Sequence, residues 1–192
     1  MPNDREGERI GRARDMRRRD LLRWGAFAGA LLLPMGALAR TIPSDKEKTL
    51  KLYNLHTGES IASTFWADGR YVSESLREID KILRDHHTDA TIATDRKLVE
   101  LMFQIQTKLD TAKGLDVVCG YRSPKTNAEL VREGRTHARN SYHLRGQALD
   151  FRAPDHDLRH VRELAMELQA GGVGYYPRAG FVHIDVGPVR HW

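Results

Sequence analysis

The chain of 192 residues contains one cysteine, few aromatic residues and no long hydrophobic run. A single thiol cannot close an intrachain disulfide, so the sequence excludes a small fold that depends on a disulfide framework. Cys119 lies in the strand-like run Leu115–Cys119, where we expect it to pack as a small buried hydrophobic side chain. The alternative is a reactive thiol of a Cys–His hydrolase, which the sequence alone leaves open.

No apolar segment is long enough for an ordinary membrane span. The apolar stretch from Trp24 holds about 12 residues, where a spanning helix needs about 20. It follows the arginines Arg17, Arg18 and Arg19, and it ends at Ala37-Leu38-Ala39. A basic start, a short apolar core and an Ala-x-Ala site are typical of an export signal, and the paired arginines favour the twin-arginine (Tat) route. We therefore expect residues 1–39 to be a Tat signal, with an uncleaved anchor as the alternative, and residues 40–192 to work in the periplasm.

Little excess charge remains outside this segment. Residues 1–39 hold eight of the 31 basic and five of the 26 acidic residues, so residues 40–192 carry a formal charge of only +2. This balance does not predict nucleic-acid binding. The glycine-rich stretch 171–177 lacks the spacing and the following helix of a dinucleotide loop. The 153 residues from Arg40 suit one domain of ordinary size.

Hydrophobic periodicity predicts a mixture of strands and helices. Alternating apolar and polar residues predict strands at 48–56, 61–66 and 115–119, the first two forming a hairpin. Helical spacing predicts helices at 73–86, 95–109, 126–132 and 155–168. The expected fold is α+β, a single domain.

Two histidines and two aspartates lie in segments that otherwise predict turns and strands. In the expected strand 181–186, His183 and Asp185 point to the same face. His143 enters from a turn, and Asp150 lies on its own strand. Two imidazoles and a carboxylate form a ligand set that Zn²⁺ accepts, with water as the fourth ligand. We expect His143, Asp150 and His183 to bind Zn²⁺ on one face of an antiparallel sheet, with helices packed on the other; for His-x-Asp alone, the alternative is a solvated strand face.

The spacing of these residues resembles that of zinc peptidases of the D-alanyl-D-alanine carboxypeptidase and hedgehog type, and most of all the MepK/YcbK-like murein endopeptidases. The segments that match are Gly120-Tyr121-Arg122-Ser123 with Asn127, Asn140-Ser141-x-His143-x-x-Gly146-x-Ala148-x-Asp150, Gly172-x-Gly174-x-Tyr176-Pro177, and Gly180-Phe181-Val182-His183-x-Asp185-x-Gly187 with Arg190 and Trp192. They cover residues 120–192 in the order found in that family.

The resemblance implies a zinc-dependent peptidoglycan hydrolase that cleaves peptide cross-links, L,D (3-3) or D,D (4-3), or stem peptides. A D-Ala-D-Ala-type carboxypeptidase and a catalytically inactive zinc-containing wall-binding module are the alternatives. In the resembling peptidases the arginine of the Tyr-Arg-Ser segment lies beside the metal. We therefore expect Arg122 to bind a substrate carboxylate or carbonyl, or to stabilise the oxyanion.

The sequence departs from the family at the position of the general base. The carboxypeptidase branch has a glutamate three residues before the last histidine, where this chain has Gly180, and relatives with His-x-His differ at Asp185. We expect Asp185 to be the base; the alternatives are that it orients a ligand or replaces His183 on the metal. Ser141 is expected to orient His143 or substrate, and Tyr176 to line the substrate groove. Arg190 and Trp192 either dock the terminus or shape that groove.

Overall fold

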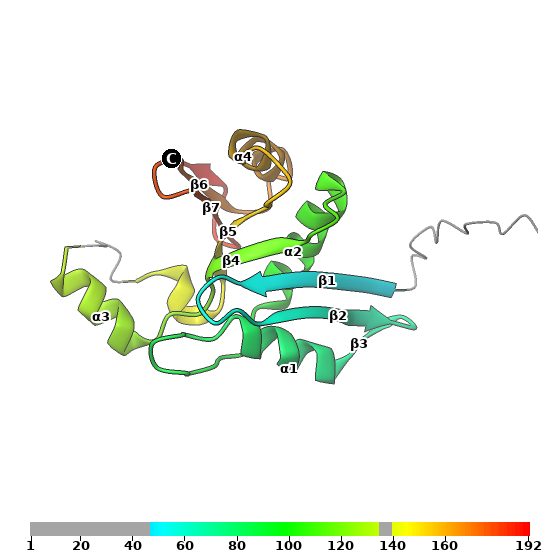
Figure 1. Cartoon of the computed structure of the whole chain (residues 1–192), viewed down its shortest axis with the longest axis horizontal. Coiled ribbons are helices and arrows are strands. Elements are labelled where there is room, and N and C mark those ends of the chain that lie inside the picture. Colours follow the sequence, from blue (N-terminus) through cyan, green and yellow to red (C-terminus); the bar gives the residue numbers. More distant parts are fainter. Residues whose placement is uncertain (1–46, 135–139) are drawn as a thin grey trace, which may run out of the picture. The chain divides into compact units, whose positions relative to one another are not determined.

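The computed structural model describes residues 47–134 and 140–192, so the expected export signal lies outside the described residues. Within these ranges the chain forms one eight-stranded sheet and four α-helices (Figure 1). The strands are β1 Glu47–Asn54, β2 Ser60–Ala67, β3 Arg70–Tyr71, β4 Leu115–Cys119, β5 Ala148–Arg152, β6 Gly172–Tyr176, β7 Phe181–Asp185 and β8 Arg190–His191. The helices are α1 Ser73–Ile82, α2 Arg96–Leu109, α3 Pro124–Arg132 and α4 Leu158–Glu167, with the short 3₁₀ helix η1 at Tyr142–Arg145.

The strand order is β3-β2-β1-β4-β5-β7-β6-β8, and most neighbours are antiparallel as expected. Two pairs, β1 with β4 and β6 with β8, are parallel, so the sheet is mixed. Parallel neighbours need a crossover connection, which β2, β3, α1 and α2 supply between β1 and β4. The sequence pattern of each strand does not encode this direction, because alternation looks the same in either sense.

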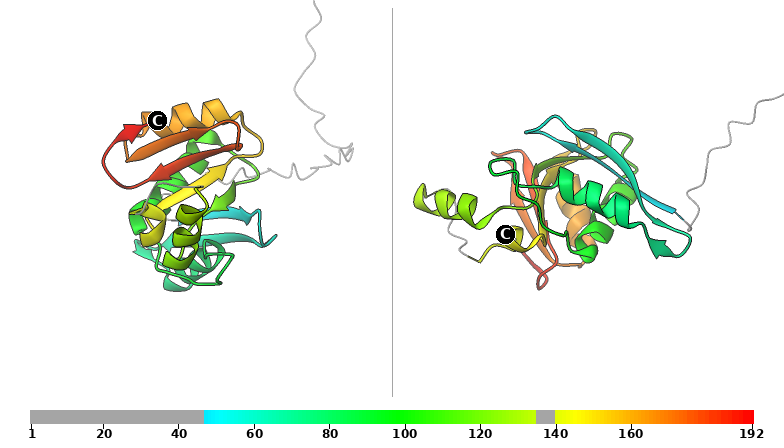
Figure 2. Two further views of the ribbon diagram at one scale, coloured as in Figure 1. Left: turned by 90° about the vertical axis from the view of Figure 1, so that its left-hand side faces the viewer. Right: turned by 90° about the horizontal axis from the view of Figure 1, so that it is seen from below.

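Three helices cover one face of the sheet. Helix α1 packs on β2, α2 packs on β1 and α4, and α4 packs on β6 and β7, as Figure 2 shows for the β6–β7 end. The apolar stripes expected from the sequence supply the core, which includes Ile79 and Ile82 of α1, Met102 and Ile105 of α2, and Val161 of α4. None of the helices in the described ranges is long and apolar enough to cross a membrane.

Helix α1 ends four residues earlier than the periodicity predicts. Leu83 closes it, and the next carboxylate, Asp85, is buried and accepts hydrogen bonds from the backbone N–H groups of His87 and Ser123. A carboxylate that bonds its own following backbone stops a helix and starts a turn. The loop after α1 is thereby attached to the segment that follows β4.

The opposite face of the sheet carries the polar residues of the candidate site. Leu149 and Phe151 on β5 and Ile184 on β7 are fully buried in the core. Since side chains alternate across a strand, Asp150 and His183 must point to the other face, where they are direct cross-strand partners. The expected fold, an α+β domain with helices on one sheet face and the site on the other, is confirmed.

Candidate metal centre

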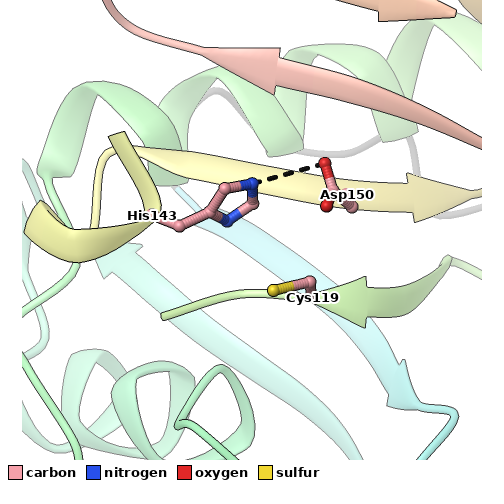
Figure 3. Close-up of side chains that lie close together, drawn as sticks. All are labelled: Cys119, His143 and Asp150. Atoms are coloured by element: carbon pink, nitrogen blue, oxygen red, sulfur yellow. Dashed lines mark ion pairs between the residues drawn. The ribbon is translucent and has the colours of Figure 1, made fainter. Parts of the chain in front are cut away.

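His143 is positioned by a tight turn just before β5. The Ser141 hydroxyl caps η1 by accepting the N–H of His143 at 3.3 Å. Gly146 then ends the turn at a φ of +63°, in the left-handed region where only glycine is unstrained. A Cβ at Gly146 would also lie 2.9 Å from the Ala93 carbonyl oxygen. The turn therefore delivers the imidazole to the sheet face, beside the carboxylate of Asp150 (Figure 3).

Three candidate ligand atoms converge from η1, β5 and β7. Nε2 of His143 lies 3.4 Å from Oδ1 of Asp150 and 3.3 Å from Nδ1 of His183. The distance between Nδ1 of His183 and Oδ1 of Asp150 is 2.7 Å. Ligand atoms bound at 2.0–2.2 Å to a tetrahedral Zn²⁺ lie roughly 3.3–3.6 Å apart. Two of the three distances have that value, and the third needs to lengthen by less than 1 Å.

The outer nitrogen of each histidine is bound to an oxygen that only accepts. Nδ1 of His143 donates to the carbonyl oxygen of Gly120 at 2.7 Å, and Nε2 of His183 donates to Oδ2 of Asp185 at 3.1 Å. Each outer nitrogen therefore carries a proton, and the inner nitrogen is the atom that faces the centre. Two inner nitrogens and a carboxylate oxygen that face one another fit a divalent cation, which would take the place of a proton held between them.

The electrostatics of the centre also favour positive charge. Burial alone would lower the pKa of His143, but the charge of Asp150 and the neighbouring Cys119 raise that pKa well above its usual value. Burial would conversely raise the pKa of Asp150, yet His143 and His183 hold it far below its usual range. The buried carboxylate thus remains ionised and stabilises a cation beside it.

Asp185 is fully buried and has hydrogen-bond partners on both carboxylate oxygens. Besides His183, it accepts from the Arg190 guanidinium at 2.7 and 3.1 Å, and from the N–H groups of Gly187 and Gly172 at 2.9 and 3.3 Å. Burial would raise the pKa of Asp185, but the hydrogen bonds from His183 and Arg190 hold it well below its usual value. The arrangement is that of a carboxylate that orients an imidazole.

Two glycines of β6 leave space for the side chains of Arg190, on β8, and Trp192, just after β8, to reach the site. Gly172 pairs with both Asp185 and Arg190, and a Cβ there would lie 2.5 Å from Oδ2 of Asp185 and 2.6 Å from Nη1 of Arg190. Gly174 pairs with His183, and its Cβ would lie 2.8 Å from the Trp192 ring. Because neither glycine has a side chain, Arg190 crosses to Asp185, and Trp192 crosses to His183.

Trp192 docks the terminus and also forms part of the site wall. Its N–H donates to the Val173 carbonyl oxygen, and its own carbonyl oxygen accepts from the N–H of Tyr175. The indole centroid lies 5.4 Å from that of His183, and Nε1 donates to the Tyr176 hydroxyl at 2.8 Å. The structure thus shows the docking role, and the role in shaping a substrate groove stays a prediction.

Arg122 lies in the loop after β4, beside the candidate ligand His143. Its backbone N–H donates to the His143 carbonyl oxygen, and Nη2 lies 3.6 Å from Sγ of Cys119. No carboxylate in the described ranges pairs with this half-buried guanidinium. The loop itself is fixed by Ser123, which caps α3 and donates its N–H to Asp85.

Cys119 is the site neighbour that the sequence analysis missed. Its Sγ and ligand atoms of His143 and Asp150 all lie within 4.8 Å of one another (Figure 3). Regular alternation would place Cys119 with Val117 on the core face, but the register of β4 against β5 shifts between these residues, and Cys119 faces Asp150 instead. The alternation of a five-residue strand is too short to reveal a bulge. The only sequence signals of an irregular strand end are Gly120 and Pro124, which follow it.

Comparison with known proteins matches residues 42–192 to the family Peptidase_M15_2, described as Peptidoglycan L,D-endopeptidase MepK. Peptidoglycan L,D-endopeptidase MepK of Escherichia coli K12 is 44% identical over 180 residues, which cover 93% of this chain and 98% of that protein. The probable peptidoglycan L,D-endopeptidase MepK of Haemophilus influenzae is 38% identical, over 93% of this chain and 96% of its own length. No solved structure matches the chain.

The match includes every residue of the centre described above, and it extends through the hairpin and helices that precede the four resembling segments. The chain therefore belongs to the MepK family of M15-type peptidoglycan peptidases.

Proposed function

We propose that this protein is a zinc-dependent endopeptidase that hydrolyses L,D (3-3) peptide cross-links of peptidoglycan. The convergence of His143 Nε2, His183 Nδ1 and Asp150 Oδ1 is the observation that carries the proposal. The names of the relatives favour the L,D bond over the D,D bond and over carboxypeptidase activity. The proposed substrate fits the proposed compartment, because an exported protein meets peptidoglycan in the periplasm. The proposal includes Tat export through residues 1–39.

His143, Asp150 and His183 would hold the metal, and the fourth position would be open to water and substrate. Bound Zn²⁺ lowers the pKa of water towards 7 and polarises a carbonyl group, which is the chemistry that amide hydrolysis requires. The protein fixes the ligands before binding, because Gly120 and Asp185 hold the outer nitrogens. A prearranged centre spends little free energy on ordering its ligands.

Arg122 is proposed to recognise the substrate. Its guanidinium has no carboxylate partner in the part of the chain that the structure describes, and it projects from a loop that is hydrogen-bonded to a ligand residue, His143. Stem peptides carry free carboxylates, which a guanidinium binds by two parallel hydrogen bonds. The same group would stabilise negative charge on the attacked carbonyl oxygen. Ser141 orients His143 through the turn, and Tyr176 is proposed to contact substrate.

Of the roles that the sequence left open for Asp185, its contacts favour orientation of His183. A general base must present a free lone pair to the water that it deprotonates. The oxygens of Asp185 are already engaged by His183, Arg190 and two backbone N–H groups, and the residue has no exposed surface. We therefore propose Asp185 as a positioning residue.

The test is digestion of purified muropeptides by the zinc-loaded protein, followed by mass spectrometry. Cleavage of 3-3 linked dimers into monomers supports the proposal; release of terminal D-Ala alone would identify a carboxypeptidase. Binding without any cleavage would identify a wall-binding module, the function that the absence of a glutamate at position 180 leaves open. The variants His143→Ala and Asp150→Ala should lose both zinc and cleavage, whereas His160→Ala, an exposed histidine of α4, should keep both.

A further inference from the structure

Exposed apolar side chains gather beside the candidate metal centre. Among the described residues, four large hydrophobic side chains are exposed: Tyr53, Tyr176, Val189 and Trp192, at 40, 38, 54 and 49%. Three of these four belong to β6 or to the segment around β8, and one of the three, Trp192, contacts the His183 ring. Exposed apolar surface is costly in water, and where it is concentrated it commonly marks a binding site.

Tyr176 and Trp192 together form a rigid surface, which we call the aromatic ledge. The indole N–H of Trp192 donates to the Tyr176 hydroxyl, and the Tyr176 ring stacks on Phe181 at a centroid distance of 4.7 Å. The backbone of Trp192 is fixed to β6 on both sides by hydrogen bonds with Val173 and Tyr175. Rings held in this way lose little conformational entropy when a ligand binds.

The ledge offers ring faces and little polar chemistry. The only polar atom of the indole is already bonded to Tyr176. The nearest cation, Arg190, lies 5.1 Å from the Trp192 ring, but its guanidinium is bonded to Asp185 and to the Pro188 carbonyl oxygen. A group that gains most from this surface is therefore an uncharged chain of methylene groups, which buries apolar area against both rings.

The ledge is close enough to the metal ligands to contact the residue next to the cleaved bond. The Trp192 ring centroid is 5.4 Å from that of His183, and an extended peptide advances about 3.3–3.6 Å per residue. We propose that Tyr176 and Trp192 form a specificity subsite that binds the aliphatic side chain of the substrate residue beside the scissile amide. This inference rests on the proposed function and names the part of the substrate that the ledge takes.

Kinetics on 3-3 linked muropeptide dimers test the ledge. Trp192→Ala should raise KM about tenfold with a much smaller change in kcat, because the lost contact is present before and during the reaction. The KM of Trp192→Phe, which keeps an aromatic ring, should lie between the KM of the wild type and that of Trp192→Ala. The matched control is Tyr53→Ala, an equally exposed aromatic residue on β1, which should leave KM unchanged. Zinc content must stay at the wild-type value in all variants; a KM unchanged in Trp192→Ala overturns the proposal.

Gly174→Ala moves the indole without removing it. The added methyl group would lie 2.8 Å from ring atoms of Trp192, so the ring must leave its place against His183. The variant should raise KM as Trp192→Ala does, although the exposed aromatic surface is still present. A wild-type KM in Gly174→Ala would show that the position of the ring does not matter to substrate, which contradicts a subsite.

Binding without turnover separates this inference from the proposed function. Titration of metal-free protein with the 3-3 dimer should shift tryptophan emission to shorter wavelength, because an apolar chain would cover an exposed indole, and the shift should be absent in Trp192→Phe. If the wild type cleaves the dimer but the emission shift and the KM are the same in Trp192→Phe, the ledge is wrong and the endopeptidase stands. If the dimer shifts the emission of Trp192 but is not cleaved by the zinc-loaded protein, the ledge stands and the endopeptidase does not.

Discussion

Replacing Asp185 by asparagine tests whether this residue orients a metal ligand. The change keeps the shape of the side chain and removes its charge. It also leaves one oxygen that can accept hydrogen bonds, whereas both carboxylate oxygens of Asp185 accept them. The carboxylate now accepts from His183, from Arg190 and from two backbone N–H groups. The amide N–H₂ would face at least one of these donors, and no water can replace the lost acceptor because Asp185 has no exposed surface.

The expected loss is in zinc affinity. Removing the partner that orients a metal-binding histidine typically weakens metal binding 10–100-fold, or about 1.4–2.7 kcal/mol. The fold should survive, because the side chain of Arg190 is 40% exposed and can turn to solvent when its partner loses charge. The variant should regain most of its turnover when zinc is in large excess, since the centre is then refilled.

The assay is competition for zinc with a chromophoric chelator, together with turnover at saturating zinc. Asp116→Asn is the matched control: Asp116 is also a largely buried aspartate of the sheet, but it is bonded to Arg152 and not to a ligand. It should keep wild-type zinc affinity. If Asp185→Asn keeps its zinc affinity and loses turnover even at saturating zinc, then Asp185 is a proton acceptor and our assignment is refuted.

Three further predictions concern neighbouring positions. Gly172→Ala should lower zinc affinity in the same competition assay, because its Cβ would push Arg190 away from Asp185; unchanged affinity would show that this ion pair is dispensable. Cys119→Ser should retain zinc and activity within a few-fold, since two histidines and Asp150 suffice as ligands; a large loss of zinc would make the thiol a ligand. Burial would raise the pKa of Asp85, but hydrogen bonds from Thr126 and Ser123 hold it far below its usual value of about 3.9. The stabilisation is therefore present above about pH 4 and lost as pH falls further. Asp85→Asn should lower Tm more at pH 7 than at pH 2.5, and an equal loss at both values would refute the linkage.

The sequence predicted the elements whose pattern is regular. Alternation on β5 and β7 placed Leu149 and Ile184 in the core and Asp150 and His183 on the opposite face, and the structure has this arrangement. The period of two is a direct consequence of strand geometry, so a correct strand assignment also assigns the faces. Bringing three remote side chains to one point needed the family resemblance as well, because spacing alone cannot set strand order.

Irregular features escaped prediction for physical reasons. The bulge in β4 turned Cys119 towards the site, and the hydrogen bonds of Asp85 ended α1 early. Both depend on tertiary partners rather than on local propensity. The crossing of Arg190 and Trp192 over β6 was equally hidden, since it depends on which strand lies beside β8. The sequence shows glycine at positions 172 and 174, but it does not show that the side chains of Arg190 and Trp192 occupy the space beside them.

Two hydrogen bonds join His143 to the segment Gly120–Arg122. The imidazole donates to the carbonyl oxygen of Gly120, and the N–H of Arg122 donates to the carbonyl oxygen of His143. The guanidinium proposed to bind a carboxylate and the nitrogen proposed to bind zinc therefore belong to one small rigid unit, so ordering one of them also orders the other. Thermodynamic reciprocity then requires that a carboxylate bound at Arg122 would strengthen zinc binding by the same factor by which zinc strengthens carboxylate binding. Under the proposed function, a shortage of zinc would therefore weaken the binding of peptidoglycan as well as its hydrolysis.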